Sequence, residues 1–305
     1  HSFDELKGVN VLFRFVFWVA VFLTCSSAPI AALEVNASAG FGQDSAASLE
    51  DVNPSAGSRN ADSDTVWMFE AGFSSQISDS LSLSYDFSGE EFVDYGENSS
   101  SSHGLGGVFE KEIGDWSYSL AGDYISMALD GSDYLDMTMF IPSLGYFRNE
   151  TYLLTSAIFQ DKSFVEMTEL DAEMKQYSLL ALQFFNNYKS NFIFGYSVAD
   201  EDAATDNYDF DETKWSIGVT HPVSFAGRNY KAKISYEMRA RDYPKVSDAQ
   251  LKSEEDRDRF QLRLTTRLSE HLELELDFDY KDRKADIDDA TYSSRLTALK
   301  LNYRR

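Results

Sequence analysis

The feature that most constrains the fold is a strict two-residue alternation near the end of the chain, from His271 to Lys281. This segment, HLELELDFDYK, has an apolar side chain at every second position and a charged one after each of them. Successive side chains of a β-strand point to opposite faces, so the pattern predicts a strand with one apolar and one charged face. The apolar face comprises Leu272, Leu274, Leu276, Phe278 and Tyr280.

The same alternation recurs along the chain and predicts fourteen strands. We expect bulges or strand ends at Pro142 and Pro222, because proline has no backbone N–H to donate to a sheet. The predicted strands are 33–42, 64–74, 80–89, 103–113, 116–127, 134–146, 151–161, 174–185, 191–200, 213–225, 229–242, 258–268, 272–282 and 292–303.

Long polar connections alternate with short ones along this series. The pattern predicts an all-β fold, a single transmembrane antiparallel up-and-down β-barrel of about 14 strands, with short periplasmic turns and long acidic extracellular loops. A soluble β-sandwich is the alternative, but it needs no such alternation and has shorter strands. The long connections are 43–63, 90–102, 128–133, 162–173, 201–212, 243–257 and 283–291, and the short ones are 75–79, 114–115, 147–150, 186–190, 226–228 and 269–271.

Aromatic residues on the predicted outward faces gather near both strand ends, as expected at the two interfaces of a membrane. Those toward the short turns are Phe73, Trp116, Tyr152, Phe185, Phe192, Phe225, Tyr230 and Tyr303. Those toward the long connections are Trp67, Phe87, Tyr124, Trp215, Phe260 and Tyr280.

Residues 1–32 have the features of a secretory signal peptide. Arg14 precedes an apolar run from Phe15 to Leu23, which is shorter than the roughly 20 residues of a spanning helix. The sequence Ile30-Ala31-Ala32 fits a cleavage site before Leu33. We therefore expect residues 1–32 to be removed, residues 33–305 to form the barrel, and the barrel to lie in the bacterial outer membrane.

The hairpin formed by 258–268 and 272–282 allows a prediction of register. Side chains on one face must pair with side chains on the same face, so paired positions share parity. A connection of three residues, Ser269 to His271, then sets Arg267 opposite Glu273, Arg263 opposite Asp277 and Arg259 opposite Lys281. The other face pairs Leu264 with Leu276.

The composition argues against two classes of function. With 51 acidic and 27 basic residues the formal net charge is −24, so we expect no nucleic-acid partner, which would need clustered Lys and Arg. The sequence contains no recognisable nucleophile motif, no histidine pair with metal-ligand spacing and no phosphate-binding loop. We therefore predict a protein that is not an enzyme and has no catalytic residues, no metal and no cofactor.

With the polar faces turned inward, the predicted lumen has two unlike sides. The early strands contribute mostly small residues, with acids at Glu34, Glu70, Asp86 and Asp123, whereas the late strands contribute a slightly basic wall. Facing walls of opposite sign would set a transverse field across a pore; alternatively, the charges pair and stabilise the barrel. We favour pairing for 258–268 and 272–282, and leave both interpretations open for 229–242. The lumen-lining candidates are Lys231, Lys233, Glu237, Arg239, Arg241, Arg259, Arg263, Arg267, Glu273, Glu275, Asp277 and Asp279.

The long connections hold most of the acidic residues. Such clusters could bind the divalent ions that bridge lipopolysaccharide, but their spacing matches no EF-hand, and solvated, mutually repelling loops are favoured. The main clusters are Asp200-Glu201-Asp202, Asp206, Asp209, Asp211-Glu212 and Glu254-Glu255-Asp256.

The tail of the chain, YKAKISYEMRARDYP through DRFQLRLTTRLSEHLELELDFDYKDRKADIDDATYSSRLTALKLNYRR, resembles the last strands of two groups of Gram-negative outer-membrane β-barrels. These are the fourteen-stranded barrel domain of surface lipoprotein assembly modulators and the monomeric porin-like barrels. The chain departs from both in ending on Arg304-Arg305 after the aromatic Tyr303. The resemblance implies insertion by the barrel-assembly machinery and contact with outer-membrane lipid and lipopolysaccharide.

Three functions fit these features. The favoured one is a porin-like channel for small hydrophilic solutes, because no segment is left over to fill the lumen except loops. The second, implied by the resemblance, is a barrel that assists export or surface display of a protein partner such as a surface lipoprotein. The third is a structural or adhesive surface barrel.

Overall fold

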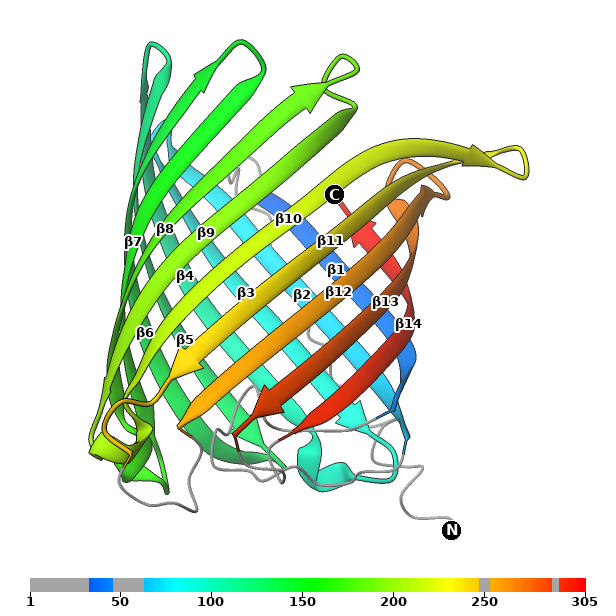
Figure 1. Ribbon diagram of the computed structural model, residues 1–305. Helices are drawn as coiled ribbons and strands as arrows, with labels where there is room; N and C mark the ends of the chain where they lie inside the picture. The colour runs from blue at the N-terminus through cyan, green and yellow to red at the C-terminus, as the bar shows by residue number, and fades with distance from the viewer. Residues whose placement is uncertain (1–32, 46–62, 247–252, 287–290) are drawn as a thin grey trace.

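The computed structural model describes residues 33–45, 63–246, 253–286 and 291–305, and the predicted signal peptide lies outside them. The chain forms one closed barrel in which each strand pairs antiparallel with its neighbour in sequence and the last pairs with the first (Figure 1). Among the described residues, no helix has the length and apolarity needed to cross a membrane.

The fourteen predicted strands are confirmed, and most are longer at one or both ends than the alternation suggested. They are β1 (Leu33–Asp44), β2 (Asp64–Ser78), β3 (Leu81–Phe92), β4 (Ser100–Ile113), β5 (Trp116–Leu129), β6 (Ser132–Arg148), β7 (Thr151–Phe164), β8 (Ala172–Phe185), β9 (Ser190–Ala203), β10 (Phe210–Phe225), β11 (Arg228–Asp242), β12 (Glu254–Arg267), β13 (Leu272–Ala285) and β14 (Tyr292–Arg304).

Large apolar side chains cover the outside of the barrel. Leu276 is 45% exposed, Trp67 46% and Phe192 47%, although each lies within a paired strand. A closed barrel satisfies its backbone hydrogen bonds internally, so this exposed apolar surface is compatible with a hydrocarbon environment. The fold therefore places its apolar residues on the outside and leaves its polar residues for the interior.

Short turns lie at one end of the barrel, as the sequence predicted, but the opposite end departs from the prediction at one place. The connection between β5 and β6, expected at 128–133, consists only of Asp130 and Gly131. Both residues have positive φ, 48° and 74°. Asp-Gly is a favoured pair for a two-residue hairpin turn, which is why the strands run closer to the turn than their alternation indicated.

The two prolines do not produce the expected bulges. Register shifts occur instead between Gln76 and Ser78 and between Met127 and Ala128. Pro142 interrupts the β6–β7 ladder, which pairs Phe140 and Ser143 with β7 but skips the two residues between them, without changing register. Because Pro142 has no N–H to donate, the pairing of β6 with β7 is lost locally, but the two strands continue in the same register.

Three of the longer connections share a 3₁₀ turn and a side-chain hydrogen bond to the preceding strand. Each contains a short 3₁₀ turn, η1 (Gly96–Asn98), η2 (Thr168–Leu170) or η3 (Asp206–Tyr208). The residue that follows each turn accepts, through its side chain, a hydrogen bond from the backbone N–H at or near the end of the preceding strand. The donors are Phe92, Phe164 and Ala203, and the acceptors are Ser99, Asp171 and Asp209, at 3.1, 2.6 and 2.6 Å.

Candidate functional site: the inner wall of the barrel

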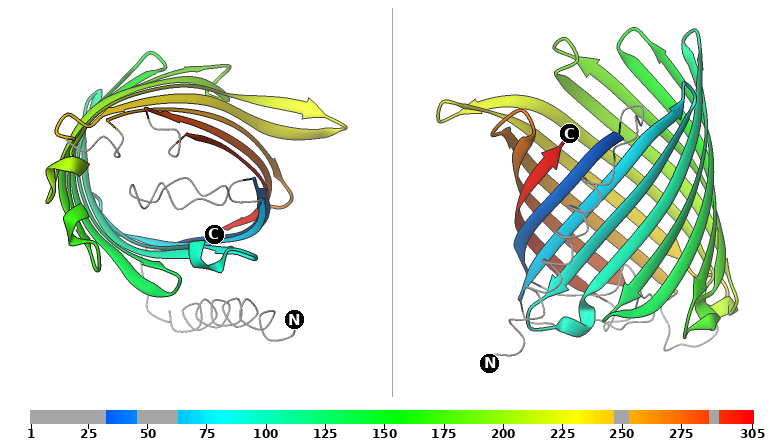
Figure 2. Two further views of the ribbon diagram at one scale, coloured as in Figure 1. Left: turned by 60° about the horizontal axis from the view of Figure 1, so that its bottom comes forward. Right: turned by 180° about the vertical axis from the view of Figure 1, so that it is seen from behind.

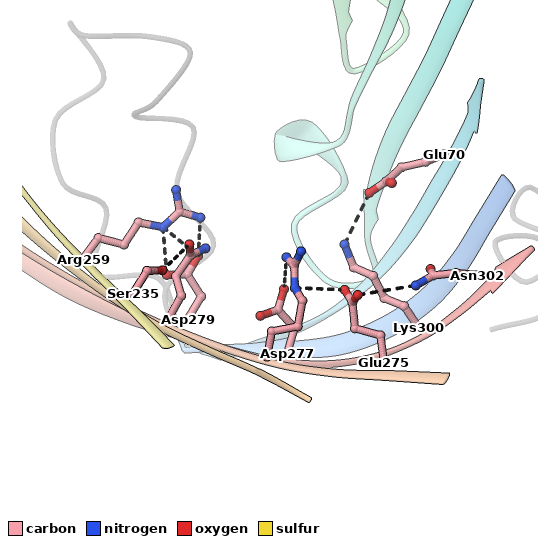
Figure 3. Close-up of polar contacts among 10 residues, drawn as sticks. Glu70, Ser235, Arg259, Glu275, Asp277, Asp279, Lys300 and Asn302 are labelled. Atoms are coloured by element: carbon pink, nitrogen blue, oxygen red, sulfur yellow. Dashed lines mark hydrogen bonds and ion pairs between the residues drawn. The ribbon is translucent and has the colours of Figure 1, made fainter. Parts of the chain in front are cut away.

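The register predicted for β12 and β13 is confirmed. Arg267 pairs with Glu273, Arg263 with Asp277 and Leu264 with Leu276. Leu264 and Leu276 face outward, whereas Arg259, Arg263, Glu275, Asp277 and Asp279 line the interior. Figure 3 shows the contacts among these charged residues. The three-residue connection therefore turns one face of this hairpin to lipid and the other to the lumen.

Side-chain contacts on this face follow the strand pairs, with two diagonal additions. Arg263 contacts Asp277 at 2.9 Å and Glu275 at 3.3 Å, and Arg267 contacts Glu273 at 3.6 Å. Arg259 lies opposite Lys281 in the register, but its Nε donates to Asp279 at 3.0 Å (Figure 3). The arginine side chain turns away from the like charge and reaches the diagonal carboxylate.

The polar network continues across the closure of the barrel (Figure 3). Asn302 on β14 donates to Glu275 at 3.4 Å, and Lys300 on β14 contacts Glu70 on β2 at 3.3 Å. The lysine reaches β2 by passing over β1 at Gly40, where an added Cβ would lie 2.7 Å from Lys300 Cγ and 2.8 Å from a backbone oxygen. Gly40 thus provides the space for an ion pair that joins strands on either side of the closure.

Several glutamates that the sequence assigned to acidic loops belong to this inner wall, Glu212 and Glu201 among them. Glu212 on β10 accepts from Arg241 at 2.6 Å and lies 3.6 Å from Arg239. Glu201 on β9 contacts Lys162 at 2.6 Å. Because Glu212 contacts two arginines of β11, the basic excess predicted for β11 is smaller than the sequence suggested.

Two lysines of β11 differ from its arginines in their ion-pair contacts. Lys231 and Lys233 pair through their backbones with Thr265 and Arg263, which places both on the inner face. Neither forms an ion pair within the described part of the chain, and the same is true of Lys214 on β10. These three amines are therefore available to a solute, unlike the paired arginines.

An interior cavity of about 810 Å³ lies between β1–β5 and β12–β14. Its lining includes the four predicted acids of the early strands, Glu34, Glu70, Asp86 and Asp123, and the late-strand residue Arg263. Glycines beside two of these acids provide the space that their carboxylates occupy. A Cβ on Gly72 would lie 2.6 Å from Asp86, and a Cβ on Gly106 would lie 2.5 Å from Asp123. The late-strand side of this cavity also carries Glu273, Glu275 and Lys300, so it is of mixed charge.

The sequence missed a third part of the inner wall, which is apolar. Register carries the inner face from strand to strand, so every member of a paired row points the same way. The row from Arg259 runs through Glu237, Ser216, Gly195, Leu180 and Leu154. The next row, from Gln261, runs through Ser235, Gly218, Ile193, Leu182 and Tyr152.

Tyr152 corrects the predicted aromatic belt. Its hydroxyl would lie 2.9 Å from a Cβ on Gly145, which pairs with the inner-face residue Ser117, so the ring points into the barrel. Tyr152, Leu153 and Leu154 are consecutive apolar residues, and both faces of β7 are therefore apolar here. Alternation cannot assign a face to such a stretch.

No sequence family model matches this chain, and no curated protein does. Solved structures do: a variant of OmpT from Vibrio cholerae lacking loop L8, described as an outer membrane protein, aligns with a TM-score of 0.54 at 9% identity over 90% of this chain and 99% of its own. An anion-selective porin from Comamonas acidovorans gives the same values, 0.54, 9%, 90% and 99%. CdiB from Acinetobacter baumannii aligns with a TM-score of 0.50 at 8% identity over 89% of this chain and 60% of its own. At these identities the similarity concerns the fold, and this chain has the fold of bacterial outer-membrane β-barrels.

Proposed function

We propose that this protein is a channel of the outer membrane that conducts small hydrophilic solutes through its lumen. The observation that supports the proposal most is the interior cavity of about 810 Å³, which is lined by acids of the early strands and by both acids and cations, Arg263 among them, of the late strands. Charged groups on opposite walls orient water and ions between them, which favours passage of polar solutes. In this arrangement the outward apolar surface contacts membrane lipid, and the acidic long-loop end contacts lipopolysaccharide.

Single-channel recording in planar bilayers tests the proposal. Purified protein should insert and give discrete conductance steps in potassium chloride, whereas a barrel that serves only export, display or adhesion should leave the bilayer silent. Absence of steps, with the protein shown to be folded and inserted, would contradict the proposal and favour those alternatives.

The ion selectivity of the channel offers a sharper version of the test. Replacing Lys231 and Lys233 by Glu removes two unpaired cations from the inner face and adds two anions, so the reversal potential in a salt gradient should shift toward cation preference. Lys175 is the matched control, because it pairs with the outward residue Phe159 and lies on the other side of the wall. Lys175→Glu should leave the reversal potential unchanged.

A further inference from the structure

The apolar part of the inner wall is continuous across three strands. Leu154 on β7 pairs with Leu180 on β8, and Leu182 on β8 pairs with Ile193 on β9. All four side chains are half-buried, so each of them still exposes apolar surface to the lumen. We name these four residues, with Tyr152, the apolar inner patch.

Such a patch is unusual inside a barrel that holds water. Barrel interiors are normally polar, and apolar surface left in water costs roughly 25 cal/mol per Å². Contiguous apolar patches on accessible surfaces most often mark places where a ligand binds. The outward face of the same strands is also apolar, so the membrane accounts for that face but not for the inner one.

Unpaired cations border the apolar inner patch. Ser216 lies in the row of Leu180, two strands away, and Lys214 is the next inner-face residue along β10. Lys233 is the next inner-face residue beyond Ser235, in the row of Ile193. With strands about 4.8 Å apart, each amine lies on the order of 10 Å from the patch.

We infer that the apolar inner patch binds amphipathic anions, whose apolar body covers the patch and whose anionic group reaches Lys214 or Lys233. The inference rests on the proposed channel and names a class of solute for it. The patch itself consists of four aliphatic side chains and one phenol ring, so the site suits compounds with an aliphatic chain or one aromatic ring.

The probe for the test is 4-phenylbutyrate, with 4-phenylbutylammonium and gluconate as charge-reversed and hydrophilic controls. Equilibrium dialysis against protein in nanodiscs, corrected for empty nanodiscs, measures binding without reference to conductance. We expect saturable binding of 4-phenylbutyrate alone, and block of single-channel current at the same concentrations. Binding without any channel would support this site and contradict the proposed function; a channel without selective binding would overturn the inference.

Two variants separate the apolar from the charged contribution. Leu180→Asn with Leu182→Asn should weaken 4-phenylbutyrate binding by roughly tenfold or more. Lys214→Gln with Lys233→Gln should weaken it as well but leave binding of the neutral 4-phenylbutanol unchanged. Ser84→Asn, an inner-face change on β3, is the matched control and should alter neither. Heat-modified mobility on gels verifies that each variant is folded, and an unchanged affinity in the folded leucine variant would overturn the inference.

Discussion

Single residues decide how tightly the first and last strands can close. Gly40 leaves space for Lys300 to cross β1 and contact Glu70. A Cβ at this position would lie 2.8 Å from the backbone oxygen of Leu299, which cannot move aside. Gly40→Val should therefore lower the free energy of unfolding by about 1–3 kcal/mol through overpacking. Urea unfolding of the protein in detergent measures this. Gly122→Val is the control, since a Cβ there meets nothing closer than 3.9 Å, and equal losses in the two variants would refute the close-packing argument.

A second prediction at this scale concerns lipid exposure. Leu276 faces outward and is 45% exposed, whereas Gln261 lies on the inner face opposite Asp279. Leu276→Arg should cost about 2–4 kcal/mol if the residue lies near the bilayer midplane. Gln261→Arg should be mild, because the side chain faces the polar lumen and Asp279 lies opposite it. Refolding equilibria into lipid vesicles compare the two, and a mild effect of Leu276→Arg would contradict the membrane-facing assignment.

Sequence patterns predicted particular residues well where only one face was apolar. The β12–β13 register followed from parity and the length of one turn, and every predicted inner pair there has its partner. The diagonal contact of Arg259 with Asp279 did not follow, because a backbone register does not fix where a long side chain turns. The apolar inner patch was missed because two apolar faces on one strand leave no alternation to detect.

At the scale of elements, the 3₁₀ turns anchor long connections to the ends of strands. Asp171 accepts a hydrogen bond from the Phe164 N–H at 2.6 Å. Asp171→Ala should lower the free energy of unfolding by about 1.5–3 kcal/mol, the range for a hydrogen bond to a charged group. Glu169→Ala, an exposed change within η2, should have little effect. Thermal unfolding compares the pair, and similar midpoints would show that the turn closes without Asp171.

A second element-scale contact joins two neighbouring long connections. Asp286 after β13 accepts from Ser253 before β12, at 2.6 Å from the hydroxyl and 3.0 Å from the N–H. Burial would raise the pKa of Asp286, but these hydrogen bonds outweigh it and lower the pKa below its ordinary value. The contact should therefore stabilise the fold above about pH 4 and be lost as pH falls through the lowered pKa.

Carboxyl-detected NMR titration tests this directly. In Ser253→Ala the pKa of Asp286 should rise toward its ordinary value, because the hydroxyl donor is gone. Ser224→Ala, which removes a hydroxyl in the distant β10–β11 turn region, should leave the Asp286 titration unchanged. An unshifted curve in Ser253→Ala would exclude the hydroxyl as the cause.

At the scale of the whole molecule, the interior of the barrel has three sides of different chemistry around its axis. Small residues and acids line β1–β4, apolar residues line the short-turn part of β7–β9, and mostly paired charges line β10–β14. Alternation predicted the number of strands and their order, since each depends on local sequence. The neutralisation of β11 arginines by Glu212 of β10 depends on contacts between strands that local patterns do not encode.

The hairpin of β10 and β11 extends beyond its neighbours (Figure 1 and Figure 2). β10 pairs with β9 only as far as Thr220, and β11 pairs with β12 only from Lys231 onward. Phe225 and Arg228 flank the two-residue turn and bond to each other across it, so Pro222 and Ser224 direct their backbone to the open side. An open strand edge can recruit the edge of another molecule, and proline and lysine there oppose this. Because Pro222 has no backbone N–H to donate, this projecting ribbon is a poorer template for pairing between two barrels than an uninterrupted edge would be.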